Sequence, residues 1–149
     1  MINILLVGCG NIGFRYLEGL ISLKEKIIID VIETNDKQIA ELKNKISKNN
    51  LQNIYFSNNY HIINKNYDIA IISTSSTYRH LIIKKILEIV NLKKIKIQYW
   101  ILEKILSNTE YKLKLINTYL RNEKVWINTP RRLYDIYIKI KKISKEPLN

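Results

Sequence analysis

The residue pattern with the clearest chemistry in this chain is a cluster of three glycines near its start. Gly8, Gly10 and Gly13 stand in the segment Gly-Cys-Gly-Asn-Ile-Gly, and the chain has only 4 glycines in all. In such a spacing the first glycine allows a tight turn, the second lets a phosphate approach the backbone, and the third lets a helix pack closely. Free N–H groups at the start of that helix attract anions. The cluster predicts a phosphate-binding loop, with a purely structural glycine turn as the alternative.

A carboxylate follows the glycines at the distance typical of a ribose-binding residue. Glu33 ends an apolar, β-branched run about 20 residues after the cluster. A carboxylate there accepts hydrogen bonds from the ribose hydroxyls of NAD and repels the extra phosphate of NADP, so NAD is favoured and NADP is the less favoured cofactor. Two alternatives remain open, because Thr34 and Asn35 can also bind ribose and Glu33 can be simply the polar end of a strand.

The elements that must position these residues alternate along the chain. Apolar runs that fit buried strands cover residues 2–7, 27–32, 54–56, 67–73, 95–102 and 124–128. Helical spacing predicts helices over residues 12–23, from about 36 to 46, and over 75–90, 109–121 and 133–143. Asn35 or Asp36 can cap the second helix, and Ser75, Ser76 or Thr77 the third. This order predicts an α/β fold with a doubly wound, mostly parallel six-stranded Rossmann sheet and helices on both faces.

Length and composition set limits on domain count and location. The 149 residues, 46% of them hydrophobic, suit one dinucleotide-binding domain over residues 1–145 followed by a frayed tail over 146–149. No apolar run reaches the length of a membrane span, no signal-like segment precedes the first strand, and the single Cys9 fits a reducing compartment. We therefore expect a cytoplasmic protein without membrane contact. One cysteine and two histidines also make a Cys/His metal site unexpected.

The net charge of +12 raises nucleic acid or another polyanion as a partner. The lysines are scattered over helix faces and turns, however, which is typical of a solvated basic surface. Arg131 and Arg132, with Tyr134 and Tyr137 nearby, belong to no known nucleic-acid-binding motif, so we expect no nucleic-acid partner. A serine hydrolase is not indicated either, because no serine stands in a G-x-S-x-G setting.

Four segments together resemble the N-terminal half of the Gfo/Idh/MocA oxidoreductases, the family of glucose–fructose oxidoreductase and inositol dehydrogenase. They are residues 4–17 with the glycine cluster, residues 67–76 with Thr74-Ser75, the pair Glu103-Lys104 at a strand end, and residues 126–132. The last segment is similar to members associated with surface-polysaccharide sugars. The Glu-Lys pair is the more diagnostic signal, because many dehydrogenases share the glycine loop.

The resemblance implies hydride transfer between a nicotinamide cofactor and a sugar or cyclitol derivative, with a sugar nucleotide as a candidate substrate. It assigns Lys104 as the active-site lysine, whose ammonium hydrogen-bonds a substrate hydroxyl and helps its deprotonation, and Glu103 as the residue that orients cofactor or lysine. It assigns the cofactor groove to Thr74 and Ser75 and the pyrophosphate loop to Gly8, Gly10, Asn11, Ile12 and Gly13. Without the resemblance, Glu103-Lys104 also fits an exposed charged pair.

Three departures from the family pattern matter. Ile105 stands where most members have proline, and Arg79 stands where many have histidine, with His80 one position later. We expect Arg79 to be either a surface charge at a helix start or a phosphate contact. The family also continues into a second α/β domain that supplies the rest of the active site and the oligomer interface. The sequence therefore predicts a truncated oxidoreductase domain, with a non-catalytic nucleotide-binding module, or half of a split enzyme needing a separate substrate-domain partner, as alternatives.

Overall fold

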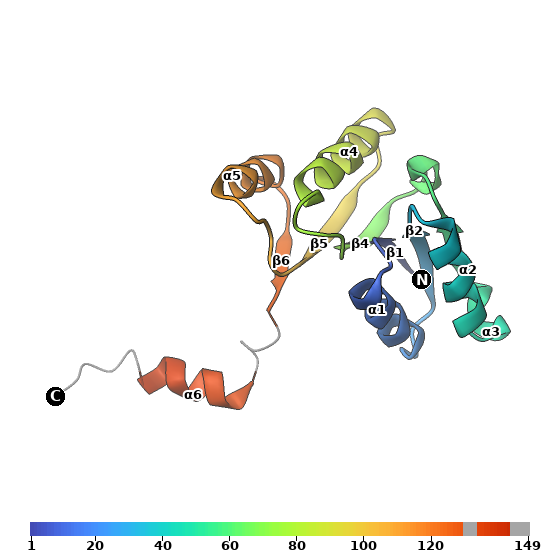
Figure 1. Ribbon diagram of the computed structural model, residues 1–149, viewed down its shortest axis with the longest axis horizontal. Coiled ribbons are helices and arrows are strands. Elements are labelled where there is room, and N and C mark those ends of the chain that lie inside the picture. The colour runs from blue at the N-terminus through green and yellow to red at the C-terminus, as the bar shows by residue number, and fades with distance from the viewer. Residues whose placement is uncertain (130–133, 144–149) are drawn as a thin grey trace.

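The structure is a computed structural model that describes residues 1–129 and 134–143 (Figure 1). Its strands are β1 (Ile2–Val7), β2 (Ile27–Ile32), β3 (Ile54–Ser57), β4 (Tyr67–Ile72), β5 (Ile97–Glu103) and β6 (Val125–Asn128). Its helices are α1 (Asn11–Ile21), α2 (Asp36–Lys45), α3 (Lys48–Leu51), α4 (Arg79–Leu92), α5 (Glu110–Tyr119) and α6 (Asp135–Ile143), with the 3-10 turn η1 (Tyr60–Ile62). The predicted alternation is confirmed. The sequence did not predict α3 and η1, because one-turn elements are too short to show a period.

The strands form one six-stranded sheet in the order β3-β2-β1-β4-β5-β6. Each of its neighbouring pairs is parallel, so the predicted doubly wound sheet is confirmed and is parallel throughout the described residues. Helices α1 and α2 cover one face and α4 and α5 the other (Figure 1). The strand order reverses between β1 and β4, and the crevice at their carboxyl ends is where ligands bind in open α/β sheets.

Strand β1 lies at the centre because it is apolar on both faces. Leu5 and Val7 belong to the core under α4 and α5, whereas Ile4 and Leu6 belong to the core under α1 and α2. All four are at most 2% exposed. Burial of each such aliphatic side chain stabilises the fold by about 1.5–3 kcal/mol. A near-continuous apolar run is what a strand covered on both faces requires.

The start of α4 differs from the prediction. The helix begins at Arg79, its N-cap is Tyr78, and no side chain caps it. Ser75 instead closes a turn, because its hydroxyl accepts the N–H of Thr77 and its carbonyl accepts the N–H groups of Tyr78 and Arg79. The prediction that residues 75–77 cap or begin the helix is therefore wrong. The prediction for the second helix is confirmed, since the Asn35 side chain accepts the N–H groups of Lys37 and Gln38.

Strand β5 also starts later than predicted, at Ile97 rather than at residue 95. Residues 93–96 close α4 instead. Lys94 adopts a positive φ of 55°, and the N–H of Ile95 bonds back to the carbonyl of Val90. Because Ile95 in this turn is apolar like the strand that follows, the apolar run in the sequence starts before the strand does. The run alone therefore does not show where β5 begins.

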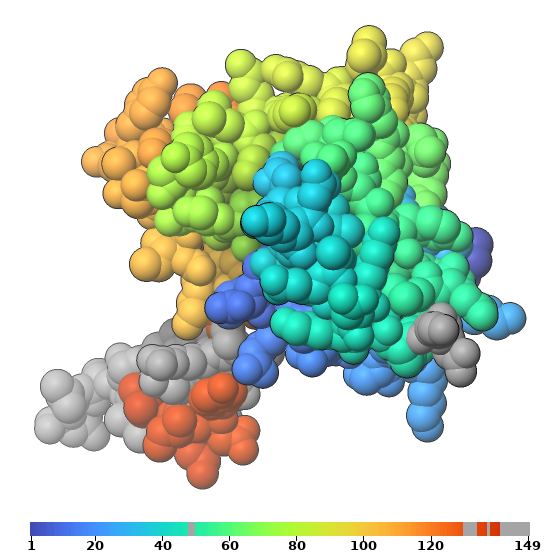
Figure 2. Space-filling model, turned by 45° about the vertical axis from the view of Figure 1, so that its right-hand side comes forward, coloured from blue at the N-terminus to red at the C-terminus, as the bar shows by residue number. Residues whose placement is uncertain are grey.

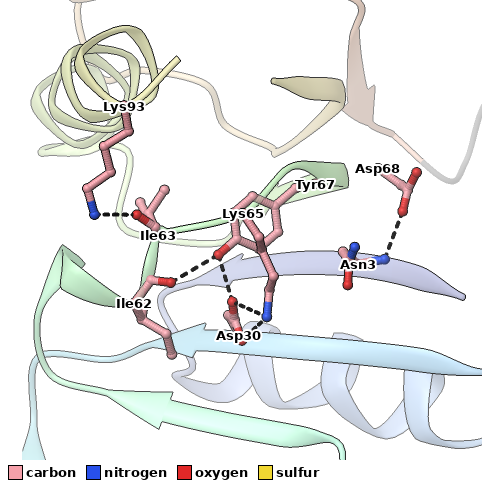
Figure 3. A network of polar contacts seen from close by, with 8 residues as sticks. All are labelled: Asn3, Asp30, Ile62, Ile63, Lys65, Tyr67, Asp68 and Lys93. Atoms are coloured by element: carbon pink, nitrogen blue, oxygen red, sulfur yellow. Dashed lines mark hydrogen bonds and ion pairs between the residues drawn. The ribbon is translucent and has the colours of Figure 1, made fainter. Parts of the chain in front are cut away.

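A buried polar network holds the connection between β3 and β4 against β2 (Figure 3). Asp30 is only 1% exposed and accepts hydrogen bonds from the Tyr67 hydroxyl at 2.6 Å and from Lys65 Nζ at 3.0 Å. Burial first, and then the bond to Asp30, raise the pKa of Tyr67. Both carboxylate oxygens have partners within the fold. The network is structural, and it was not predictable from the sequence because Asp30 stands inside an apolar run.

Helix α6 projects from the body formed by the sheet and α1–α5 (Figures 1 and 2). Three of its isoleucine side chains are exposed, namely Ile136 at 60%, Ile138 at 41% and Ile140 at 53%. The predicted tail, residues 146–149, lies outside the described residues, as does Leu133 at the predicted start of this helix. Within the described ranges, no helix combines the length and apolar character needed to cross a bilayer.

Candidate functional site

The glycine loop lies at the carboxyl end of β1, and two of its glycines are required by close packing. Gly8 has a φ of +84°, and a Cβ atom there would lie 2.6 Å from Cγ2 of Thr74. At Gly13 a Cβ atom would lie 2.0 Å from the carbonyl oxygen of Gly8. The first contact brings the ends of β1 and β4 together, and the second seats α1 against the turn. Both roles match the predicted packing of the loop.

Gly10 differs from these two glycines. Its φ is −67°, which any residue adopts, and no atom beyond its neighbours in the chain lies within 4 Å of an ideal Cβ at this position. Gly10 is the N-cap of α1, no side chain caps the helix, and its first turn contains no acidic residue. Asn11 and Ile12 are exposed beside it. The positive end of the helix dipole therefore faces an open side of the loop.

A hollow of about 300 Å³ lies beside the loop, where the carboxyl ends of β1, β2 and β4 meet. Its lining includes the predicted residues Gly8, Gly10, Glu33, Thr74 and Ser75, together with Thr34, Tyr60 and Tyr78. A larger hollow of about 640 Å³ lies at the opposite edge, between Asn66, Lys96 and Asn122. That second hollow contains none of the predicted site residues, and it lies at the amino ends of the strands, where sheets of this class do not bind ligands.

Glu33 is fixed beside the loop by both of its carboxylate oxygens. Oε2 accepts the N–H of Cys9 at 2.8 Å, and Oε1 accepts the N–H of Asn35 at 3.1 Å. The Gln38 side chain donates to the carbonyl of Cys9 at 3.2 Å, so β2 and α2 both hold the loop backbone. Each carboxylate oxygen can accept a further bond, and Glu33 therefore keeps acceptor capacity toward a ribose. Of the alternative ribose contacts, Thr34 lines the hollow, whereas the side chain of Asn35 caps α2.

Thr74 and Ser75 line the hollow from the end of β4, where the resemblance places them. The Thr74 hydroxyl oxygen is buried and has no hydrogen-bond partner within the described residues. Ser73, just before it, donates its hydroxyl to the carbonyl of Gly8 at 2.6 Å. The ends of β1 and β4 are thus joined, and Thr74 offers an unused polar atom beside the loop.

Glu103 and Lys104 follow each other at the end of β5 but lie in different surroundings. Glu103 is 7% exposed, and its carboxylate accepts hydrogen bonds from the Tyr16 hydroxyl and the Asn128 amide, both at 2.5 Å. Burial, followed by the bond to Glu103, raises the pKa of Tyr16. Lys104 is exposed, and the peptide bond between Lys104 and Ile105 is cis. The alternative of an exposed charged pair is therefore wrong for Glu103.

Arg79 is buried, which the sequence did not predict. It is only 2% exposed, so the prediction of a surface charge is wrong. Its guanidinium donates to backbone carbonyls on two loops: Thr74 after β4, and Glu103, Ile105 and Leu106 after β5. Its third nitrogen, Nε, is buried and has no hydrogen-bond partner within the described residues. Burial lowers the pKa of Arg79, and the nearby Glu103 carboxylate opposes that shift.

The carboxyl edge of the sheet thus brings together most of the predicted site residues. The glycine loop, Glu33 and Thr74-Ser75 share one hollow, and Arg79 connects Thr74 to the Lys104 turn, residues 103–106. Arg131 and Arg132 lie outside the described residues. In the part of the chain that the structure describes, no three His, Cys, Asp or Glu side chains gather as a metal site.

Sequence reasoning missed two contacts at this edge. Tyr16 and Asn128 entered the sequence analysis only as members of the segments 4–17 and 126–132, without an assigned role. Both donate to the Glu103 carboxylate. The one signal for Asn128 was that a polar residue ends β6, the strand next to β5. No signal in the sequence indicated that Tyr16 would bond Glu103.

The chain matches no protein-family model and no curated protein, but its fold is similar to several solved structures. Myo-inositol 2-dehydrogenase from Lactobacillus plantarum is 19% identical with a TM-score of 0.70, over 96% of this chain and 40% of that chain. The WlbA dehydrogenase from Bordetella pertussis, in complex with NADH and UDP-GlcNAcA, is 13% identical with a TM-score of 0.74. The match covers 97% of this chain and 42% of that chain. The transcriptional regulator Gal80p from Kluyveromyces lactis is 14% identical with a TM-score of 0.72, and the match covers 97% of this chain and 37% of that chain.

These similarities establish the fold, and the chain spans about two fifths of the length of the structures it matches. The oxidoreductases among them agree with the family resemblance seen in the sequence. The same fold also occurs in a transcriptional regulator. Function must therefore be argued from the site itself.

Proposed function

We propose that this chain binds a nicotinamide dinucleotide at the carboxyl edge of its sheet, as the cofactor-binding domain of an oxidoreductase. The observation that carries the proposal is Gly10. Packing requires glycine at Gly8 and Gly13, but Gly10 has an ordinary φ and open space where a side chain would be. The fold does not need a glycine there, whereas a pyrophosphate that approaches the backbone does.

The strand order supports one orientation for the dinucleotide. Its pyrophosphate would rest on Gly10, Asn11 and Ile12 at the start of α1. The adenosine half would extend toward β2, where the Glu33 carboxylate and Thr34 line the hollow. The nicotinamide half would extend across the switch point toward β4 and β5, past Thr74 and Ser75. The Thr74 hydroxyl, which lacks a partner in the described fold, supports a polar ligand on that side.

Glu33 supports NAD rather than NADP as the cofactor. Its carboxylate is fixed beside the loop by the N–H groups of Cys9 and Asn35 and cannot swing away without losing both bonds. A 2′-phosphate would meet this negative charge directly. The bound NADH of the WlbA dehydrogenase is consistent with the same choice of cofactor.

The reaction we propose is oxidation or reduction at a hydroxyl-bearing carbon of a sugar or cyclitol derivative. The nicotinamide, when bound, exchanges the hydride, and Lys104 would hydrogen-bond the substrate hydroxyl whose proton is transferred. The support for this is that Lys104 is exposed at the edge where the nicotinamide half would lie, on a turn held by buried contacts. The UDP-GlcNAcA bound by the WlbA dehydrogenase favours a sugar nucleotide as the substrate class.

A second candidate function is nucleotide binding without turnover by this chain alone, as a binding module or beside a separate substrate domain. The lining of the hollow favours it, because that lining contains residues of the glycine loop, Glu33 and Thr74 but not Lys104. Sustained NADH production from NAD and a panel of UDP-sugars, by this chain alone, would exclude it.

Calorimetric titration with NADH and NADPH tests the proposal. We expect NADH to bind and NADPH to bind at least about tenfold more weakly, equivalent to about 1.4 kcal/mol. Gly10→Val should lower NADH affinity at least about tenfold, with an unchanged melting temperature because the site around Gly10 is open. Gly19→Ala, on the exposed side of α1, is the matched control and should bind as the wild type does. Absence of binding to both nucleotides would refute the proposal.

A further inference from the structure

We propose that Arg79 is a positioning residue, which holds the Lys104 turn in register with the cofactor groove. This inference rests on the proposed function, because it concerns how the nicotinamide half of the dinucleotide meets the turn. Arg79 begins α4 and is 2% exposed. Its side chain passes between the end of β4 and the loop that follows β5.

The contacts of Arg79 join two loops that the backbone does not connect. One terminal nitrogen donates to the carbonyls of Glu103, Ile105 and Leu106, which surround Lys104. The other donates to the carbonyl of Thr74, in the wall of the hollow. A shift of either loop would leave buried carbonyl groups or a buried cation without partners, which is costly.

The same turn is held from the opposite face of the sheet. Tyr16, from α1, and Asn128, from the end of β6, both donate to the Glu103 carboxylate. Arg79 binds the carbonyl of that same residue from the side of α4. Glu103 is therefore fixed through its side chain on one face and its backbone on the other. Lys104, the next residue, has an exposed side chain, but its backbone follows directly on the fixed Glu103.

An arginine suits this task and a lysine does not. A guanidinium presents five N–H donors in one rigid plane, so it can bind carbonyls that lie in different directions at the same time. An ammonium is a compact group with three donors, and it cannot bridge two loops with the same geometry. The Glu103 carboxylate lies close enough to favour the charged form of Arg79, which helps it remain a cation when buried.

The position of this contact predicts a selective effect on binding. The glycine loop and Glu33 hold the pyrophosphate and adenosine, and Arg79 touches neither. Loss of Arg79 should therefore weaken binding of the nicotinamide half of the ligand more than binding of the adenosine and pyrophosphate. ADP-ribose contains the adenosine and pyrophosphate but lacks the nicotinamide, so the ratio of NADH affinity to ADP-ribose affinity isolates the effect. A general loss of stability would lower both affinities together.

The test measures both affinities for the full chain and for Arg79→Lys, with Arg121→Lys as the control at an exposed arginine. We expect the NADH to ADP-ribose ratio to fall at least about tenfold in Arg79→Lys, since small displacements at a site have effects of this size. The ratio should not change in Arg121→Lys. Ethylguanidinium added to Arg79→Ala should restore part of the ratio. An unchanged ratio, or equal loss of both ligands, would overturn the inference.

A measurement on the wild type keeps the inference testable if the Arg79 variants do not fold. NADH should slow amide hydrogen exchange in residues 103–107 at least about tenfold more than ADP-ribose does. Equal protection by the two ligands would overturn the role of Arg79 but leave cofactor binding intact. If the wild type binds neither ligand, the proposed function itself fails, and the two failures are thereby distinguished.

Discussion

The glycine loop and the Lys104 turn lie at the same edge of the sheet but are held in different ways. Backbone shape constrains the loop, because Gly8 and Gly13 lie where no Cβ atom fits. Hydrogen bonds between the loop backbone and the side chains of Ser73, Glu33 and Gln38 hold it as well. Side chains from three other elements hold the turn, namely Arg79 from α4, Tyr16 from α1 and Asn128 from β6. Steric fit of glycines is thus an added constraint at the glycine-loop end of this site, whereas the end that carries Lys104 depends on side-chain hydrogen-bond donors.

The largest effect is expected when the steric fit of the loop is broken. In Gly13→Ala the new Cβ would lie 2.0 Å from a backbone oxygen that cannot move away without displacing β1. We expect the free energy of unfolding to fall by about 3 kcal/mol or more in urea denaturation. Gly19→Ala, in the same helix but in open space, is the control and should gain about 0.5–1 kcal/mol. Similar stabilities for the two variants would show that packing does not hold the loop.

A smaller effect is expected when one donor to the turn is removed. Tyr16→Phe keeps the ring but deletes the hydroxyl that donates to the Glu103 carboxylate. The Asn128 amide then remains as a donor to that carboxylate. We expect a loss of about 2 kcal/mol in the free energy of unfolding, the usual value for a bond to a charged group. Tyr111→Phe, at a residue that is 71% exposed, is the control and should change little. Equal effects of the two substitutions would contradict a supporting role for Tyr16.

The smallest effect concerns pH and the glycine half of the site. Burial, assisted by the nearby Glu33 charge, raises the pKa of Cys9 from 9.0 to about 12. The folded state therefore keeps the neutral thiol where the unfolded chain ionises, so this contribution is complete below pH 9 and is lost as the pH rises toward 12. We expect the wild type to lose about 1 kcal/mol more than Cys9→Ala between pH 8 and 10, measured by urea denaturation. If the stabilities of the wild type and Cys9→Ala change in parallel with pH, the contribution of the buried thiol is refuted.

The local patterns of the sequence predicted where the glycine loop and the residues around it lie in the fold. The glycine spacing placed the loop at the end of β1, and the apolar runs located all six strands of the described sheet. Glu33 and Thr74 line the same hollow as the loop, as expected. These features were predictable because each depends on a few neighbouring residues and on the rule that parallel strands end at one edge.

The supports of the Lys104 turn could not be predicted in the same way. Arg79 was expected to be a surface charge or a phosphate contact, because nothing near it in sequence shows that it bonds the backbone after β5. Asp30, inside an apolar strand, gave no sign of Tyr67 and Lys65 as its partners. The start of α4 was misplaced because Ser75 closes a turn that resembles a helix cap in sequence.

The sequence by itself determined the order of strands and helices, the glycine loop and the acidic residue beside it. Those features follow from hydrophobic periodicity and from the conformational freedom of glycine, both of which act over short stretches of chain. Only the tertiary structure decided that Glu103 is buried, that Lys104 is exposed, and that Arg79 joins the loops on either side of them. The physical reason is that buried polar groups must find partners, and the sheet brings those partners from α1, α4 and β6.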